Sequence, residues 1–131
     1  MNTSNETNSA KLVEKLMQMG ISPRYRAFAY LIYLLNTLTQ YEILRMSNAD
    51  LLDHVATETG LSVKHIASNF KSLMINCEYV NGERNKIYTT LACLNKNDIP
   101  TLKEFVMAVQ CILIDQQANE KQSTVLNSSP Q

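Results

Sequence analysis

The sequence predicts an all-α protein, a compact bundle of about five to six helices that contains a helix-turn-helix. Apolar residues recur at helical spacing along most of the chain, and helix start and stop signals divide these stretches. A length of 131 residues with 45% apolar residues suits one folded domain. We expect a disordered tail over 1–8, a helix-turn-helix domain over 9–116 and a flexible tail over 117–131, because both ends are rich in polar residues.

The first two predicted helices lie before residue 46. Ser9 is expected to cap the first, which ends at Gly20. Ser22 and Pro23 suit the N-cap and first position of the second helix, which is expected to run to about Arg45. Its apolar residues lie nearly all around the helix, which predicts a central helix enclosed by its neighbours.

The next two predicted helices meet at a glycine. A start signal at 47–50, with Asn48 as the expected N-cap, opens one helix, and Gly60 ends it. Ser62 is expected to cap the following helix. The apolar stripe of that helix is Ile66, Phe70, Leu73, Met74 and Cys77.

In the last third of the chain, the secondary structure of one segment is ambiguous and that of the next is clearly helical. Over 79–90, the pair Asn81-Gly82 between β-branched and aromatic residues predicts either a short hairpin or a loop with a short helix. Thr101 and Glu104 form a capping box ahead of a final helix with an apolar face.

Composition excludes several function classes. The formal net charge is zero, so a DNA-binding surface must come from local clustering of cations. Cys77, Cys93 and Cys111 are widely spaced, which suits free thiols in a reducing cytoplasm. We expect no metal, no cofactor and no enzymatic activity, since neither ligand clusters nor a catalytic constellation occur. The apolar run at 27–35 is too short to span a membrane, so we expect a cytoplasmic protein.

The stretch "VATETGLSVKHIASNF" has the residue types that two steeply crossing helices need. Ala56 permits close approach, Gly60 supplies a positive φ, and Leu61 fills the corner. Ser62 caps the second helix, and Ile66 packs beneath the first. The pattern fits a DNA-reading helix-turn-helix, and it also fits a helical hairpin in a bundle without a DNA role.

The outward face of the helix after Gly60 favours DNA binding. No acidic residue occurs between Gly60 and Asn76. Asparagine can bridge adenine edges, serine can adapt to several bases, and lysine reaches phosphates. The candidate DNA-binding residues are Ser62, Lys64, His65, Ser68, Asn69, Lys71 and Ser72.

Three segments resemble one known family. "MGISPRYRAFAYLIYLL", "HVATETGLSVKHIASNFKSLM" and "IPTLKEFVMAVQCIL" are similar, in order and spacing, to the C-terminal effector domain of the sporulation master response regulator (stage zero sporulation protein A) family, over about 12–115. The resemblance implies an all-helical domain that binds promoter DNA as tandem copies and acts through RNA polymerase, with 62–76 as its recognition helix. Ala67 and Ser68 stand where the family has glutamate and arginine, and Leu52-Asp53 replaces a Tyr-Pro pair. We expect no receiver domain in a chain of this length.

Two functions follow as hypotheses. The first is a sequence-specific DNA-binding transcription regulator that inserts 62–76 into the major groove of promoter DNA, as a homodimer or as tandem copies. The alternative is an interaction protein without DNA binding, an antagonist that docks on the full-length sporulation regulator or on RNA polymerase. For that role the expected docking face is the final helix, over 101–115.

Overall fold

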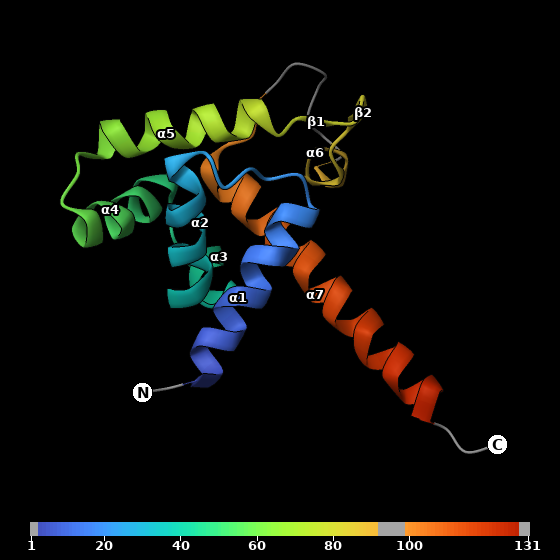
Figure 1. Cartoon of the computed structure of the whole chain (residues 1–131). Helices are drawn as coiled ribbons and strands as arrows, with labels where there is room; N and C mark the ends of the chain where they lie inside the picture. The colour runs from blue at the N-terminus through green and yellow to red at the C-terminus, as the bar shows by residue number, and fades with distance from the viewer. Residues whose placement is uncertain (1–2, 92–98, 129–131) are drawn as a thin grey trace.

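The computed structural model describes residues 3–91 and 99–128, and within them the protein is all-α apart from one small hairpin (Figure 1). The fold class expected from the sequence is confirmed, with seven helices in the described residues rather than five to six. The elements are α1 (Thr3–Gln18), α2 (Arg26–Thr37), α3 (Gln40–Arg45), α4 (Asn48–Thr59), α5 (Val63–Asn76), β1 (Tyr79–Val80), β2 (Glu83–Arg84), α6 (Lys86–Thr90) and α7 (Leu102–Ser128).

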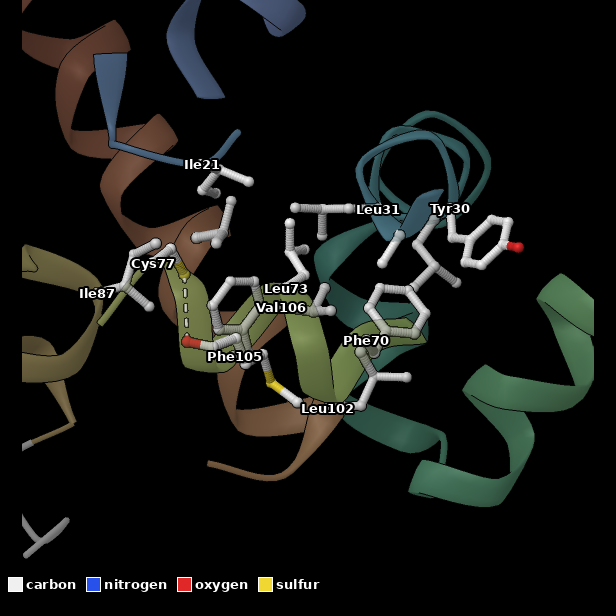
Figure 2. Packing of buried hydrophobic residues seen from close by; sticks show 14 of the residues in the cluster. Ile21, Tyr30, Leu31, Phe70, Leu73, Cys77, Ile87, Leu102, Phe105 and Val106 are labelled. Atoms are coloured by element: carbon white, nitrogen blue, oxygen red, sulfur yellow. Dashed lines mark hydrogen bonds between the residues drawn. The ribbon is translucent and has the colours of Figure 1, made fainter. Parts of the chain in front are cut away.

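The core joins three helices that are distant in sequence. Leu31 of α2, Leu73 of α5 and Phe105 of α7 are each fully buried. Figure 2 shows their side chains converging between the three helices. Arg26, Ala29 and Asn36 form an exposed stripe, so α2 is central as predicted but is not enclosed on every side. Because α5 and α7 bury their apolar stripes against it, one core fixes the position of the helix-turn-helix.

Both ends of the chain contain more helix than expected. We predicted disorder over 1–8 and a cap at Ser9, but α1 begins at Thr3. We predicted a flexible tail from 117, but α7 continues to Ser128 and extends beyond the rest of the molecule in Figure 1. Neither helix contains Gly or Pro, the residues that most weaken a helix. Each further residue can therefore join the helix and add one backbone hydrogen bond. In the described part of the chain, no helix has the length and apolar character needed to cross a membrane.

The predicted helix from Ser22 to Arg45 is two helices. α2 ends at Thr37, and Thr39 starts α3 with a capping box. The backbone N–H of Glu42 donates to Oγ1 of Thr39 at 3.1 Å, and the backbone N–H of Thr39 donates to Oε1 of Glu42 at 2.9 Å. This reciprocal cap makes a new start more favourable than continuation of α2.

The start of α2 also differs from the prediction. Ser22 and Pro23 do not open the helix, because Oγ of Ser22 accepts from the backbone N–H of Arg24 at 3.2 Å and so closes a turn. The helix begins at Arg26, with Tyr25 as its N-cap.

The N-cap of α4 is Ser47 rather than Asn48. Ser47 and Asp50 form a capping box. Asn48 has another role, since its Oδ1 accepts from the backbone N–H of Lys103 at 2.8 Å and joins α4 to the start of α7. The predicted capping box of Thr101 and Glu104 at that start is confirmed.

Both alternatives for 79–90 are present. Asn81 and Gly82, with φ of 54° and 82°, make the tight turn of the β1–β2 hairpin, and α6 follows it. Asn85, 4% exposed, anchors this unit. Its Nδ2 donates to the backbone carbonyl oxygens of Met19 at 2.7 Å and Cys77 at 2.8 Å, so it joins the ends of α1 and α5 to α6.

Candidate nucleic-acid interface

The turn between α4 and α5 is closed by short-range hydrogen bonds. Gly60 is in the left-handed region, with φ of 75°, and its N–H donates to the carbonyl of Ala56 at 2.8 Å. The N–H of Leu61 donates to Oγ1 of Thr59 at 3.2 Å. Oγ of Ser62 accepts from the N–H of His65 at 3.1 Å. The predicted glycine stop and serine cap are therefore confirmed, and they fix the crossing of the two helices.

The predicted apolar stripe holds α5 in place. Ile66, Phe70, Leu73, Met74 and Cys77 are all buried. In Figure 1, α5 lies along one side of the molecule, with the other helices on the side that it buries. The opposite face of α5 is therefore free to project outward as a ridge.

Five of the seven candidate residues lie exposed on that ridge. They are Lys64, His65, Ser68, Lys71 and Ser72. Ser62 is also exposed, but it is the N-cap that precedes α5. Asn69 is half-buried, and its Nδ2 lies 3.2 Å from the hydroxyl oxygen of Tyr30. Asn69 therefore lies at the edge of the ridge that faces α2, and one of its amide donors already has a partner.

The exposed residues form stripes along α5. Lys64 and Lys71 are two helical turns apart and lie on one edge. Lys71 and Ala67 also line a shallow groove of about 490 Å³ between α5, the start of α4 and the start of α7. His65 and Ser72 are likewise two turns apart, on the edge nearer Asn69. Lysines thus follow one side of the ridge, and a histidine and a serine follow the other.

Two apolar residues on this surface were missed in the sequence analysis, Ile75 at 52% exposed and Val63 at 36% exposed. Leu61 was expected to fill the corner between α4 and α5, but it is 36% exposed and is only partly covered there. Ile75 stands two turns after Ser68, so the helical period alone would have placed it on the outward face. An exposed aliphatic side chain there can make an apolar contact with a thymine methyl group.

The charge around the ridge is asymmetric. α5 carries no carboxylate, whereas α4 carries Asp50, Asp53 and Glu58. The carboxylate of Asp50 accepts from the N–H of Ser47, and hydrogen bonds to Ser47 lower its pKa, so it remains charged within its cap.

Arg26 is exposed, one turn before Tyr30 on the same face of α2. Because Tyr30 contacts Asn69, we expect Arg26 to add positive charge beside α5.

A polar cluster between α2 and α4 has a structural explanation. The ring of His54 stacks on Tyr33, with centroids 5.0 Å apart, and its Nε2 lies 2.8 Å from Oγ1 of Thr37. Oγ1 of Thr37 also donates to the carbonyl of Tyr33 at 2.7 Å. These contacts join α2 to α4, the first helix of the helix-turn-helix, and they leave the ridge on α5 as the candidate site.

No family model matches the chain, and neither a curated protein nor a solved structure was found to match it. The resemblance to the sporulation regulator family therefore stays a prediction from sequence.

Proposed function

We propose that the protein is a sequence-specific DNA-binding transcription regulator that places α5 in the major groove of promoter DNA. One observation carries the proposal: α5 projects a ridge without carboxylates, and that ridge is held by a capped turn and a buried stripe. The major groove is wide enough to admit one α-helix. A regulator of this kind would act in the cytoplasm.

The two stripes of the ridge suggest which residues contact phosphates and which contact bases. Lys64 and Lys71 would contact phosphates along one edge and set the register of the helix. His65, Ser68 and Ser72 would face base edges, with Asn69 at the border. Each good bidentate contact to a base would contribute about 1–3 kcal/mol of discrimination against a wrong base.

One copy would bind weakly. The chain has 12 basic and 12 acidic residues, and phosphate contacts supply much of the affinity for DNA. If two copies are joined as a dimer, binding of one copy to its half-site holds the second at a high effective concentration beside the adjacent half-site, which raises the overall affinity. We therefore propose a homodimer or tandem copies on the promoter.

The test is selection of bound fragments from random and genomic DNA at low salt, repeated at higher salt. A sequence-enriched pool whose binding weakens steeply with salt supports the proposal. Lys71→Glu should abolish the gel shift on a selected fragment. Binding that survives this substitution would reject the placement of α5 in the groove.

An interaction protein is the second candidate, favoured by the zero net charge and by an exposed apolar pair. Tyr41 and Leu44 of α3 are 65% and 54% exposed. The docking face expected from the sequence, 101–115, is not available as a whole, because its apolar stripe of Leu102, Phe105, Val106, Val109 and Ile112 is buried in the core. Any docking on RNA polymerase or on a full-length sporulation regulator would instead use α3. Pull-down with each partner, compared between the native chain and Leu44→Glu, distinguishes this candidate from DNA binding.

A further inference from the structure

The chain that joins α1 to α2 lies along one edge of the proposed recognition helix. At one end of this segment, Nδ2 of Asn85 donates to the carbonyl oxygens of both Met19 and Cys77, which places the end of α1 beside the end of α5. At the other end, the hydroxyl oxygen of Tyr30 lies 3.2 Å from Nδ2 of Asn69. The residues between Met19 and Tyr30 therefore run beside the C-terminal half of α5, just below it in Figure 1.

This segment brings two exposed arginines to that edge of α5. Arg24 lies in the turn before α2, where its backbone N–H donates to Oγ of Ser22 at 3.2 Å, and Arg26 is the first residue of α2. Both arginines are exposed, and neither forms an ion pair with another described residue. The sequence has no acidic residue between Glu14 and Glu42. The two arginines are therefore available to an anionic partner at the surface.

Carboxylates near α5 come from other elements. α4, which carries three acidic residues, borders the opposite edge of α5, where its start and Lys71 line one groove. The hairpin lies beyond the end of α5 in Figure 1, and its Glu78 is paired with Arg84 at 3.4 Å. Glu83, the other acid of the hairpin, lies in β2. α2 and the segment before it thus bring only positive charge to the edge that carries Asn69.

Cations therefore flank α5 along both of its long edges. Lys64 and Lys71 follow one edge, and Arg24 and Arg26 border the other. An α-helix with its side chains is about 10–12 Å across, and the major groove of B-DNA is about 12 Å wide. Each side of that groove is the sugar-phosphate backbone of a different strand. Two groups of cations separated by one helix therefore match the spacing of the two phosphate rows.

We infer that Arg24 and Arg26 contact phosphates of one DNA strand, while Lys64 and Lys71 contact phosphates of the other strand. The recognition helix is then held from both sides of the major groove. Guanidinium groups suit this role, because they bind phosphate oxygens through two parallel N–H donors. This inference rests on the proposed function and adds the α1–α2 connection to it as a second contact element. Since phosphate contacts carry no base information, the arginines fix affinity and register rather than sequence preference.

The salt dependence of binding to a fluorescein-labelled duplex of the selected sequence tests the arginine contacts. Arg24→Gln and Arg26→Gln should each lower the slope of log K against log salt by about 0.9 in magnitude and weaken binding about threefold to tenfold. Arg45→Gln is the matched control, because Arg45 is exposed on α3, away from α5 in Figure 1, and it should leave both values unchanged. Circular dichroism checks that each variant folds. Arginine variants with the native slope and affinity would overturn the inference.

Neutral phosphates assign the contacts to strands. Methylphosphonate linkages, placed one at a time along each strand of the same duplex, remove the charge of single phosphates. Those that weaken binding of the native chain but not of Arg26→Gln should lie on one strand. Those to which Lys71→Gln is insensitive should lie on the other strand. If the phosphates of Arg26 and Lys71 lie on the same strand, the two-sided arrangement is wrong.

The outcomes separate this inference from the proposed function. A native chain that binds no duplex at any salt concentration would reject both. A native chain that binds the selected sequence, and whose slope falls in Lys71→Gln but not in Arg24→Gln or Arg26→Gln, would keep the proposed function and reject only the contacts of the α1–α2 connection.

Discussion

The amide nitrogen of Asn69 lies 3.2 Å from the hydroxyl oxygen of Tyr30, which joins the proposed recognition helix to α2. The ring of Tyr30 stands edge-on to Phe70, with centroids 5.8 Å apart, so it packs against the buried side of the same part of α5. One side chain of α2 therefore both packs under α5 and orients a residue at the edge of its exposed ridge. The position of that edge depends on α2 as well as on the helix-turn-helix.

Tyr30→Phe should lower the free energy of unfolding by about 1 kcal/mol. The ring contact with Phe70 is kept, while the hydrogen-bond partner of Asn69 is lost. Urea denaturation measures the change. Tyr41→Phe is the control, because Tyr41 is 65% exposed and should cost less than about 0.5 kcal/mol. A Tyr30→Phe variant as stable as the native chain would show that the hydroxyl contact does not contribute.

Lys71→Gln should reduce the salt dependence of DNA binding. If the ammonium group contacts one phosphate, its removal lowers the slope of log K against log salt by about 0.9 in magnitude. Fluorescence anisotropy on a selected fragment, at several salt concentrations, gives the slope. Lys86→Gln on α6, also an exposed lysine, is the control and should leave the slope unchanged. Equal reductions in both variants would mean that only total charge matters.

Ser68→Glu should weaken DNA binding by at least about tenfold while the fold is kept. Ser68 is exposed on the ridge, so a carboxylate there is solvated in the free protein but meets phosphates and base edges in the complex. Circular dichroism checks the fold, and Ser68→Ala serves as the control for loss of the hydroxyl alone. If Ser68→Glu binds as tightly as Ser68→Ala, Ser68 lies outside the interface.

Features determined by near neighbours in the chain were predictable. Gly60, Ser62 and the stripe from Ile66 to Cys77 are local signals, and each has its expected role in the structure. The break between α2 and α3 was missed, although Thr39 and Glu42 carry a local signal of the same kind as Thr101 and Glu104. A continuous apolar stretch favoured one long helix, and the reciprocal cap of Thr39 outweighed it.

Features that depend on distant contacts were not predictable from sequence. The amide of Asn69 has the right chemistry for adenine, but nothing near it in the chain indicates that Tyr30 lies beside it. Asn48 has the composition of an N-cap, yet its oxygen is used by Lys103 of α7. Asn85 similarly gains its role from Met19 and Cys77, which the fold brings together. In each case an ambivalent polar side chain takes a partner that only the tertiary structure provides.

Gly20→Ala should destabilise the fold strongly, by about 3 kcal/mol or more. Gly20 has φ of 87°, and a Cβ atom there would lie 2.3 Å from Cγ2 of Val80 in the hairpin. The substitution therefore adds a steric clash to the cost of a left-handed backbone. Thermal or urea unfolding measures the loss.

Two further variants separate the clash from the backbone cost. Gly60 has φ of 75°, but no atom lies within 4 Å of a Cβ added there. Gly60→Ala should therefore lower the free energy of unfolding by only about 1 kcal/mol. The double variant Gly20→Ala/Val80→Ala removes the clash and should be less destabilised than the sum of its single variants. Equal losses for Gly20→Ala and Gly60→Ala would mean that the hairpin moves away from Gly20 at little cost.

The capping boxes of α3 and α4 should make stability depend on pH in the acid range. Hydrogen bonds from the backbone and side chain of Thr39 lower the pKa of Glu42 from its ordinary 4.5, and those from Ser47 lower the pKa of Asp50 from 3.8. The folded chain therefore binds fewer protons than the unfolded chain between the ordinary and lowered pKa values. Stability from the caps is complete above about pH 4.5 and is lost as the pH falls through the lowered pKa values.

Glu42→Gln and Asp50→Asn test this dependence by urea denaturation between pH 6 and pH 3 (roughly the span over which carboxylates protonate). Each variant should be less stable than the native chain at pH 6, because a neutral amide caps more weakly than a carboxylate. The difference should shrink toward pH 3, where the native carboxylates take up protons and lose the same advantage. Glu58→Gln, at an exposed acid outside both boxes, is the control, and its difference from the native chain should stay small throughout. A difference for Glu42→Gln that does not vary with pH would show that the charge of the carboxylate is not what stabilises α3.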